Sequence, residues 1–545
     1  MGSAEKEFNL LYEPWIRVMK SDASVEEVTL PDALIRAHEY TALAGEMPTQ
    51  DVAMLRLLLA VMHAVFNRSD AEGKEAPLKD RDEAWRRWEG LWRRGSLPER
   101  PIMEYLTRYE DRFWLFHPER PFYQATTASI GTTYTAAKLN GEISESSNKL
   151  RLFPMRSGEE KNQLTYAEGA RWLLHVNGYD DTSAKPKGKG KDLPSVGAGW
   201  LGKLGLIHAC GSSLFETLML NFVLVNEQNE IWPDATPIWA LPSARGDERV
   251  EIPLPDDQAA LLTLQSRRLL LERKQDRIIG YRLLGGDFFQ RENAFAEQMT
   301  LWRPIFAKKE IVGYQPARHN PAKRLWREFS SLTNTSDKGH RPGIITWHIS
   351  LQSVGILNAQ QFISYQIASV QYGDKDFFIT DVFSDQLSFR LNLLSQLGLS
   401  WRCKIQNEIE RCENLAHAVE RLALNLRKAA GGSGKAENSD GEKAKEQFFY
   451  RVDEPFRKWL ITLDANQGDA ERLDRQRAWH IEVRRIAQSL GQELTQAAGP
   501  AAFAGRSISK KDEKQTIFYS APKAYNQFLY DVKKQMERSE ADGKS

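Results

Sequence analysis

Residues 363–382 read ISYQIASVQYGDKDFFITDV, two apolar runs separated by a short polar turn. Branched and aromatic side chains recur in both runs, as they do in β-strands. Gly373 and Asp374 are residue types that tight turns favour. The stretch therefore predicts a β-hairpin with a charged tip, although an ordinary exposed turn is the commonest outcome for such a sequence.

The spacing of apolar residues changes downstream of Asp385. Over 387–426 they recur every three to four residues, as on one face of a long helix. Residues 429–445, which contain the run GGSG, predict a flexible connection. Further helices are expected near 446–464, 470–496 and 519–539, so the C-terminal part predicts a four-helix bundle.

Upstream of the hairpin, strands and helices are mixed. Residues 49–66 predict a buried helix, because the apolar run is shorter than a bilayer requires and contains Arg56 and His63. Apolar segments predict paired strands at 10–18 with 25–30, at 262–271 with 276–284, and at 344–350 with 377–382.

Long loops interrupt this mixed part over 126–205, a stretch rich in Gly, Ser, Asn and Lys. Long loops in a compact domain are usually functional or disordered. We therefore expect an α+β protein with two domains. A large mixed N-terminal domain with functional loops would span 1–384, and a C-terminal four-helix bundle would span 385–545.

The charges of the chain nearly cancel, with 74 Lys and Arg against 73 Asp and Glu. Proteins that hold long nucleic acid alone usually carry a basic excess, so any phosphate contact here must be local. Cys210, Cys403 and Cys412 lie far from any C-x-x-C spacing, which excludes a disulfide framework or a cysteine zinc site. The polar N-terminus has no signal-peptide core, and we expect a cytoplasmic protein.

Residues 197–204, GAGWLGKL, match a phosphate-binding P-loop until the last position. Leu204 stands where a Ser or Thr hydroxyl would bind magnesium, so we reject nucleotide hydrolysis. Glycines still let backbone N–H groups approach a polyanion or a groove floor closely, and a lysine adds charge. The candidate residues of this glycine loop are Gly197, Ala198, Gly199, Trp200 and Lys203.

The segment ahead of the glycine loop is strongly basic. It carries Lys185, Lys187, Lys189 and Lys191 with no acid between them. Such a lysine arm suits contacts with phosphates, and it fits a solvated loop equally well.

Signatures of catalysis are absent from the sequence. There is no H-E-x-x-H, no G-x-S-x-G and no histidine and carboxylate spacing of a metal-dependent nuclease or deaminase. Cys210 beside His208 is weak evidence for a nucleophile, because neighbours in sequence seldom face each other. We expect no enzyme activity, no cofactor and no metal.

Several blocks follow one another along the chain: FNLL at 8–11, PWIRV at 14–18, HPERPFYQ at 117–124, QSRR at 265–268 and FFYR at 448–451. Together with 149–153, 197–205, 214–218 and 314–326, they resemble the CasA family, the large subunit of the type I-E CRISPR Cascade surveillance complex. Their order and the C-terminal bundle carry the resemblance, which covers nearly the whole chain.

The resemblance implies roles for particular residues. The glycine loop would enter the DNA minor groove at the protospacer-adjacent motif, where readout is degenerate, and the methyl of Ala198 could narrow the tolerated motifs. Lys308 or Lys309 would reach the same groove. A wedge hairpin at Tyr372, Gly373, Asp374, Lys375 and Asp376 would start unwinding. A handle loop over 138–153, with Asn140, Asn148 and Lys149, would anchor the subunit at the guide RNA.

The resemblance also implies the partners. These are the guide CRISPR RNA, double-stranded target DNA, the other Cascade subunits and a nuclease-helicase recruited in trans, without a membrane. The protein would inspect a short motif while RNA pairing supplies the sequence specificity. Two alternatives are a structural scaffold that does not touch DNA and a degenerate P-loop protein that binds a nucleotide.

Overall fold

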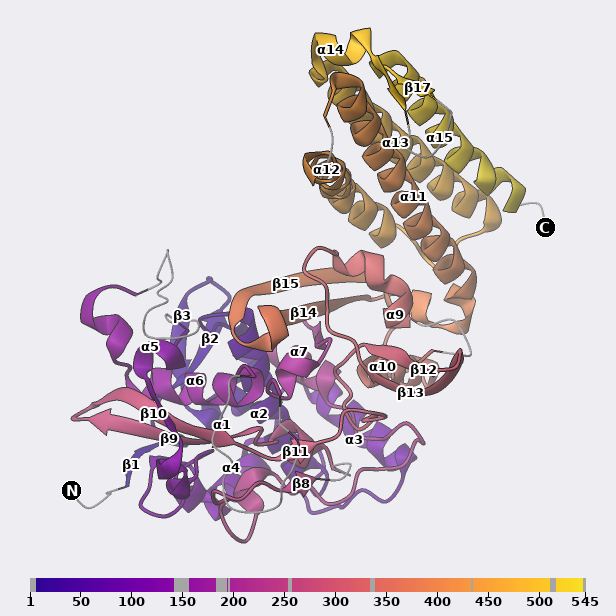
Figure 1. Ribbon diagram of the computed structural model, residues 1–545. Coiled ribbons are helices and arrows are strands. Elements are labelled where there is room, and N and C mark those ends of the chain that lie inside the picture. The colour runs from indigo at the N-terminus through magenta and orange to yellow at the C-terminus, as the bar shows by residue number, and fades with distance from the viewer. Residues whose placement is uncertain are drawn as a thin grey trace. The chain divides into compact units, whose positions relative to one another are not determined.

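A computed structural model describes residues 6–141, 156–182, 194, 197–252, 257–333, 339–432, 435–509 and 516–542, with side chains except at 435–438, 509 and 538–542. The chain forms two compact units. The N-terminal unit comprises Met1–Leu325, Ser331–Leu357 and Ile363–Gln386. The C-terminal unit comprises Trp326–Ser330, Asn358–Phe362 and Leu387–Ser545. The first is mixed and the second mostly helical, which confirms the α+β fold (Figure 1).

The N-terminal unit contains several small sheets and no large one among its described residues. The three-stranded sheets are β3 (Val25–Val28), β2 (Ile16–Lys20) and β4 (Tyr40–Leu43); β6 (Thr132–Thr135), β10 (Arg277–Gly285) and β9 (Arg267–Lys274); and β15 (Ile379–Arg390), β14 (Phe362–Tyr372) and β7 (Ile207–Cys210). The two-stranded sheets are β1 (Glu7–Asn9) with β5 (Trp114–Phe116), β8 (Glu251–Ile252) with β11 (Phe288–Phe289), and β12 (Trp302–Ala307) with β13 (Glu310–Pro316).

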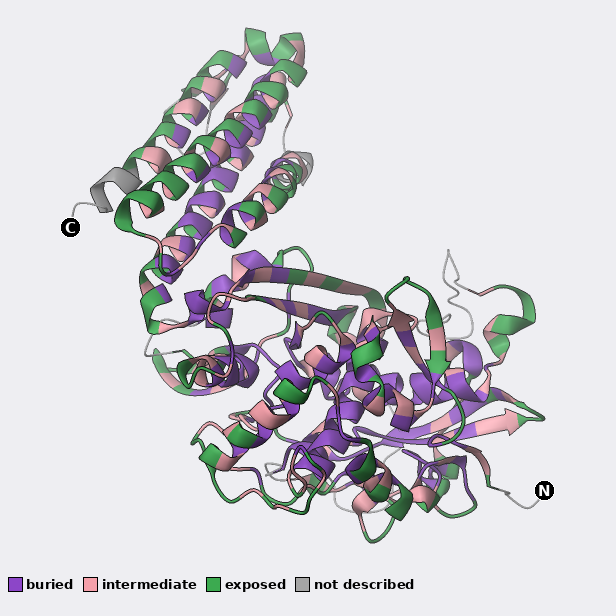
Figure 2. Ribbon diagram, turned by 180° about the vertical axis from the view of Figure 1, so that it is seen from behind, coloured by how far each residue is buried: buried purple, intermediate pink, exposed green. Residues whose placement is uncertain are grey.

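Helix α2 (Pro48–Phe66) lies at the centre of this unit. It is long and apolar enough to cross a membrane, but 94% of its most apolar window is buried inside the protein. Figure 2 shows it among other buried elements. The prediction of a buried core helix is confirmed. The other helices before the C-terminal bundle are α1 (Leu30–Ile35), α3 (Arg81–Arg94), α4 (Glu99–Arg108), α5 (Ala136–Leu139), α6 (Tyr166–Tyr179), α7 (Leu214–Asn221), α8 (Gln258–Leu262), α9 (Phe329–Thr333) and α10 (Gly343–Ser353).

The hairpin prediction is confirmed, but one predicted strand pair is wrong. β14 and β15 are neighbours in one sheet, with the turn at Gly373–Asp376. Residues 344–350, expected as the partner of 377–382, belong to helix α10. Pro342 precedes this helix, and its buried residues Ile344, Trp347, His348 and Leu351 follow helical spacing. The β-branched start of this segment favoured a strand, but tertiary packing selected the helix.

The C-terminal helices α11 (Leu399–Ala430), α12 (Lys435–Ile461), α13 (Asp469–Ala497), α14 (Gly499–Ala504) and α15 (Ala521–Asp542) pack together. The long helix was expected from 387, but β15 continues to Arg390 and the helix begins at Leu399. The connection expected over 429–445 was also too long, because α12 already begins at Lys435. A short hairpin, β16 (Arg506–Ser509) with β17 (Thr516–Tyr519), was not expected.

A buried carboxylate fixes the packing of α11 against α13. Glu408 accepts hydrogen bonds from the side chains of Arg411, Trp479 and His480, the last at 2.8 Å. Burial alone would raise the pKa of Glu408, but the hydrogen bond from His480 and the charge of Arg411 outweigh it, and the pKa is lowered. The carboxylate therefore stays ionised within the bundle.

Candidate nucleic-acid interface

The C-terminal end of α6 is the point at which several loops meet. The helix begins with a capping box in which Thr165 and Glu168 exchange side-chain to backbone hydrogen bonds, and it ends at Tyr179. The four residues from Tyr179 to Thr182 each contact a segment that is distant in sequence. These contacts bring together candidate residues that the sequence could only name separately.

The glycine loop packs against this helix end. The backbone N–H of Gly199 donates to the carbonyl oxygen of Asp180 at 2.9 Å. A Cβ atom at Gly199 would lie 2.3 Å from the carbonyl oxygen of Gly178, so only glycine fits there. Ala198 is buried, so its methyl does not reach the surface of the loop.

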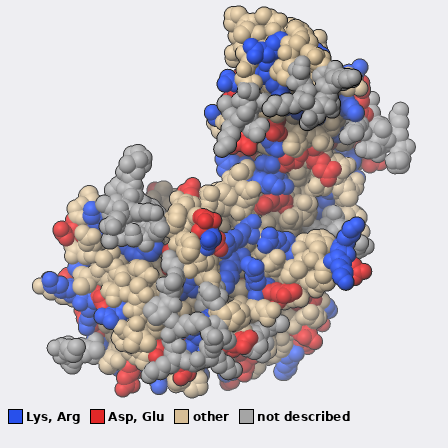
Figure 3. Space-filling view, viewed as in Figure 1, with Lys and Arg blue, Asp and Glu red and all other residues tan. Residues whose placement is uncertain are grey.

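Basic side chains surround the loop. Arg267 is buried, donates to the carbonyl oxygen of Gly197 at 2.7 Å and pairs with the carboxylate of Asp180 at 2.5 Å. Burial, together with positive neighbours, lowers the pKa of the Lys203 amine to about 7. Those neighbours are Arg267, Arg291, Arg318 and Arg249. Figure 3 shows Lys and Arg side chains gathered on the same face of this unit as the β14–β15 hairpin.

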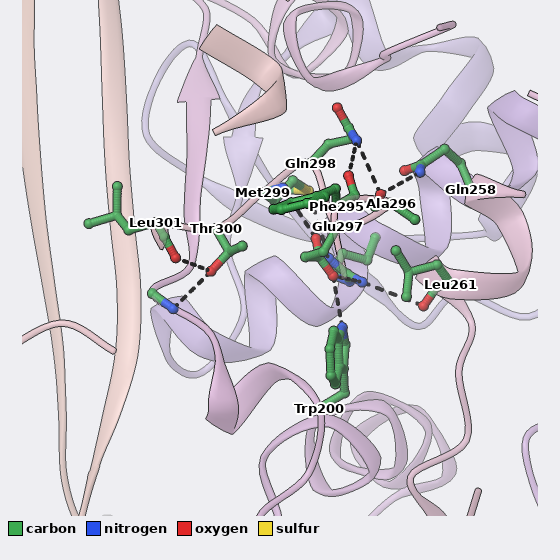
Figure 4. Close-up of polar contacts among 12 residues, drawn as sticks. Trp200, Gln258, Leu261, Phe295, Ala296, Glu297, Gln298, Met299, Thr300 and Leu301 are labelled. Carbon is green, nitrogen blue, oxygen red and sulfur yellow. Dashed lines mark hydrogen bonds and ion pairs between the residues drawn. The ribbon is translucent and has the colours of Figure 1, made fainter. Parts of the chain in front are cut away.

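Trp200 points into the protein and not toward a ligand. Its indole N–H donates to the carboxylate of Glu297 at 2.8 Å (Figure 4). Glu297 also forms a buried ion pair with Arg56 of helix α2 at 2.8 Å. The backbone N–H of Trp200 donates to the hydroxyl of Ser266 at 3.0 Å. The interior thus fixes the loop, and Gly197 and Lys203 are the two candidate residues that are only half-buried.

The wedge hairpin is held at its tip by Thr182. The backbone N–H of Thr182 donates to the carbonyl oxygen of Asp376 at 2.9 Å. The side-chain hydroxyl of Thr182 donates to the carbonyl oxygen of Lys375 at 2.7 Å. Lys375 and Asp376 have φ angles of 53° and 60°, which are uncommon for residues other than glycine. The two hydrogen bonds therefore stabilise a turn that costs conformational energy.

The remaining contacts of the hairpin divide its residues into an inner and an outer set. Tyr372 donates its hydroxyl to the carbonyl oxygen of Tyr179 at 2.6 Å. Arg318 lies over the Tyr372 ring at 5.0 Å and pairs with Asp376 at 2.9 Å. Asp374 and Lys375 are exposed. Tyr372 and Asp376 thus attach the tip, whereas Asp374 and Lys375 face outward.

Phe377, which sequence reasoning missed, is the exposed aromatic residue beside this tip. Its side chain is 43% exposed, whereas the ring of Phe378 packs against Gly373. The signal in the sequence was the pair of phenylalanines directly after a turn. The pair does not show which ring is exposed, because Phe377 has a helical backbone conformation and strand β15 begins only at Ile379.

The lysine arm, with Lys185, Lys187, Lys189 and Lys191, lies outside the described residues. Its flanks are described. On one side Thr182 binds the hairpin tip, and on the other the carbonyl oxygen of Pro194 accepts from Arg249 at 2.5 Å. Both ends of the arm are therefore attached next to the glycine loop.

The handle loop starts at the same helix end. Lys138 pairs with Asp181 at 3.0 Å, and Asn140 caps the short helix α5. The buried amide of Asn140 donates to the carbonyl oxygen of Lys161 at 3.3 Å. Asn148 and Lys149 lie outside the described residues. Asn140 is thus part of the base from which this loop begins.

Lys308 and Lys309 are placed differently. They form the exposed two-residue turn between β12 and β13, with φ angles of 49° and 75°. Figure 1 shows this hairpin well away from the tip of the β14–β15 hairpin. The structure does not bring these lysines next to the loops at the end of α6.

Three observations on the described residues concern the chemistry considered in the sequence. No group of three or more His, Cys, Asp or Glu side chains among these residues is placed to hold a metal ion. Burial raises the pKa of the Cys210 thiol to about 12, so this cysteine does not form a reactive thiolate near neutral pH. The glycine loop leads through a short turn (Leu201–Lys203) into strand β7, whereas a P-loop opens an α-helix.

The chain matches a family of CRISPR-associated proteins. The family model described as CRISPR-associated protein Cse1 matches residues 9–490, which is most of the chain. The chain therefore belongs to the Cse1 family, also called CasA, and the expected resemblance is confirmed.

Relatives and solved structures agree with this assignment. The CasA/Cse1 protein of Thermus thermophilus is 33% identical over 341 residues, which span 61% of this chain and 61% of that protein. The match thus covers less than two thirds of that relative. The crystal structure of Thermobifida fusca Cse1 has a TM-score of 0.78 and 28% identity, and covers 98% of this chain and 99% of that chain. One chain of a structure described as a CRISPR RNA-guided surveillance complex has a TM-score of 0.66 and 18% identity. The match covers 97% of this chain and 100% of that chain, and it shows the shared fold.

Proposed function

We propose that this chain is a non-catalytic subunit of an RNA-guided surveillance complex that reads a short motif in duplex DNA and begins its unwinding. The observation that supports this most is the position of Thr182. It binds the hairpin tip and precedes the lysine arm, close to the glycine loop. A motif reader, phosphate contacts and a wedge are thus within reach of one duplex.

The glycine loop reads the minor groove through its backbone. Ala198, Gly199 and Trp200 are buried, so the accessible part is the backbone around Gly197 with Lys203 beside it. The minor groove shows nearly the same acceptors for both orientations of a base pair, and a backbone reader therefore tolerates several motifs.

The hairpin tip opens the duplex next to the motif. Lys375 contacts a phosphate, and the exposed ring of Phe377 inserts between base pairs, as apolar wedges do in proteins that kink DNA. Each lost stacking step costs about 1–2 kcal/mol, and the phosphate contacts of the lysine arm offset this locally. Pairing with the guide RNA then extends the opening.

The remaining partners are assigned to other surfaces. The handle loop over 138–153 contacts the guide RNA, and Lys308 or Lys309 contacts the groove at a distance from the glycine loop. The C-terminal bundle, proposed to be a separate domain from about residue 385, contacts other subunits and receives the nuclease-helicase in trans.

The test uses the complex reconstituted with guide RNA and its other subunits. Phe377→Ala should leave assembly and motif-dependent DNA binding within about twofold, but slow base unstacking tenfold or more, because the wedge acts after encounter. A fluorescent base analogue next to the motif reports the opening rate. Phe518→Ala is the control, because Phe518 is a similarly exposed aromatic residue in the other unit.

The outcomes separate the proposal from a structural scaffold. If Phe377→Ala, Lys375→Ala and the arm with all four lysines changed to alanine leave binding and opening unchanged, the chain does not read DNA through this surface. A scaffold role would then remain. If the lysine-arm variant weakens binding to all duplexes equally, the arm contacts phosphates. If Phe377→Ala slows base opening as well, the wedge role is supported as a separate step.

A further inference from the structure

One pocket of the N-terminal unit is lined by three arginines. Arg112, Arg120 and Arg245 surround it together with Gln265. It encloses about 370 Å³ including its open mouth. Aromatic residues form part of the wall, among them Phe122, Tyr123 and Trp239. The arginines come from the segment around β5 and from the loop before β8, so only the fold brings them together.

The positive charge of this pocket is only partly balanced by the described residues. Neither Arg112 nor Arg120 forms an ion pair with a described side chain. Burial lowers the pKa of Arg112 and the charge of Arg120 adds to the decrease, whereas the charge of Asp111 opposes it. Arg245 lies 3.6 Å from Asp287, but that carboxylate already pairs with Arg268. Like charges held close together without a counterion destabilise a protein, and an anion between them would remove that cost.

Two polar atoms of the pocket also lack partners among the described residues. Gln265 is 3% exposed, and its side-chain oxygen accepts no hydrogen bond. The buried Nε of Arg245 donates no hydrogen bond either, because its distance of 3.6 Å from the Asp287 carboxylate is too long for one. Leaving a buried polar atom without a hydrogen bond costs free energy. A bound oxyanion would accept from Arg245, and an ordered water held by that anion would donate to the Gln265 oxygen. Tyr123 in the wall has a φ angle of 56°, a strained backbone conformation that a large side chain seldom adopts.

The residues at the start of strand β9 and just before it connect this pocket with the glycine loop. Ser266 and Arg267 bind the backbone of Trp200 and Gly197. Gln265 lines the arginine pocket. The QSRR block over 265–268 therefore contacts both sites, and a ligand in the pocket would stabilise the segment that positions the glycine loop.

We propose that the arginine pocket binds a phosphate group, either free or as part of a nucleic-acid backbone. Guanidinium groups match phosphate oxygens in bidentate geometry and keep their charge at every physiological pH. The site is separate from the motif reader, and it does not require that the chain reads DNA. Phosphate binding here would add a second, sequence-independent contact on the same unit.

The experiment titrates the full chain with orthophosphate and follows thermal unfolding, with sodium chloride of equal ionic strength as reference. Phosphate should raise the unfolding temperature of the natural sequence in a saturable way. Arg112→Gln with Arg120→Gln should weaken phosphate binding at least tenfold. Arg93→Gln with Arg100→Gln is the control, since these arginines are exposed on helices α3 and α4.

One further readout separates a binding site from a structural role. Without phosphate, the Arg112 and Arg120 double variant should be at least as stable as the natural protein, because it removes the unpaired like charges. A variant that is less stable without phosphate and responds to phosphate normally would overturn the proposal. So would a phosphate response no larger than that to chloride.

Short RNA and DNA without terminal phosphates then identify the source of the phosphate. If they compete with orthophosphate in the natural protein and not in the double variant, the pocket binds the nucleic-acid backbone. If they do not compete while orthophosphate still binds, the ligand is a free phosphate. Because no motif and no partner subunit is used, failure of this proposal leaves the proposed DNA reading untouched.

Discussion

Thr182 donates its backbone N–H to the carbonyl oxygen of Asp376 and thereby joins the end of helix α6 to the tip of the β14–β15 hairpin. The tip contains two residues with positive φ, which a free turn would not hold. A rigid tip is needed if a side chain such as Phe377 is to unstack bases, since a flexible one would fold back. The contact thus connects a local hydrogen bond with the proposed opening of DNA.

Thr182→Val should loosen the hairpin tip without unfolding the protein. The change removes the hydroxyl bond to Lys375 but keeps the backbone bond, so the loss should be about 0.5–1.5 kcal/mol. Hydrogen exchange at residues 374–378 should become at least threefold faster. Thr380→Val is the matched control, because its hydroxyl bonds within the hairpin to Gln371 at 3.0 Å. Equal exchange at the tip in both variants would contradict the assignment.

Gly199→Ala should destabilise the protein by about 2–4 kcal/mol, because the added methyl meets the backbone of α6. Gly468→Ala should change stability by less than about 0.5 kcal/mol, since Gly468 has open space around it. Urea unfolding of both variants measures the difference. If Gly199→Ala proves as stable as the control, the close packing of the loop is wrong. Because a Gly199 variant is destabilised, loss of DNA binding shows a role in motif reading only when the variant is also shown to be folded under the binding conditions.

Lys203 should make stability depend on pH. Its pKa is about 7 in the folded protein, below its ordinary value of 10.5. Between these values the unfolded chain holds a proton that the folded protein lacks, so stability rises with pH in this window. Lys203→Met should abolish that rise, whereas Lys309→Met, at an exposed site, should keep it. Urea unfolding at about pH 7, 8 and 9 measures the slopes, and equal slopes in all three proteins would refute the shift.

Glu297→Gln should be among the most damaging single changes in the N-terminal unit. It leaves Arg56 buried with its charge uncompensated and weakens the bond from Trp200, at a cost of about 3–5 kcal/mol. Glu104→Gln breaks an exposed pair with Arg100 and should cost less than about 1 kcal/mol. Thermal unfolding of the two variants is the measurement. Similar costs would mean that the buried pair does not fix the glycine loop.

Local patterns predicted the elements well where apolar runs and turn residues are clear. The hairpin at 363–382 followed from two apolar runs around a polar turn, and helix α2 followed from one apolar run too short to cross a bilayer. The segment at 344–350 was predicted wrongly because its short apolar run satisfies both strand and helix patterns. Such runs are decided by the neighbours that they pack against.

The glycine loop shows a second limit of sequence reasoning. Its composition indicated a polyanion site, yet Gly199 is required first by its approach to Gly178, and Trp200 by its bond to Glu297. The sequence alone does not distinguish a glycine that is required for packing from one that is required for ligand binding. Phe377 was missed for a similar reason, since exposure cannot be read from an aromatic pair.

The sequence by itself determined the α+β class, the helical C-terminal part, the central buried helix and the family, because these depend on periodicity and on the order of blocks along the chain. Only the tertiary structure decided that Thr182 meets the hairpin tip, that Ala198 and Trp200 face inward and that Arg112 and Arg245 share a pocket. These contacts join segments far apart in sequence, and no local pattern encodes which distant backbone a side chain will reach.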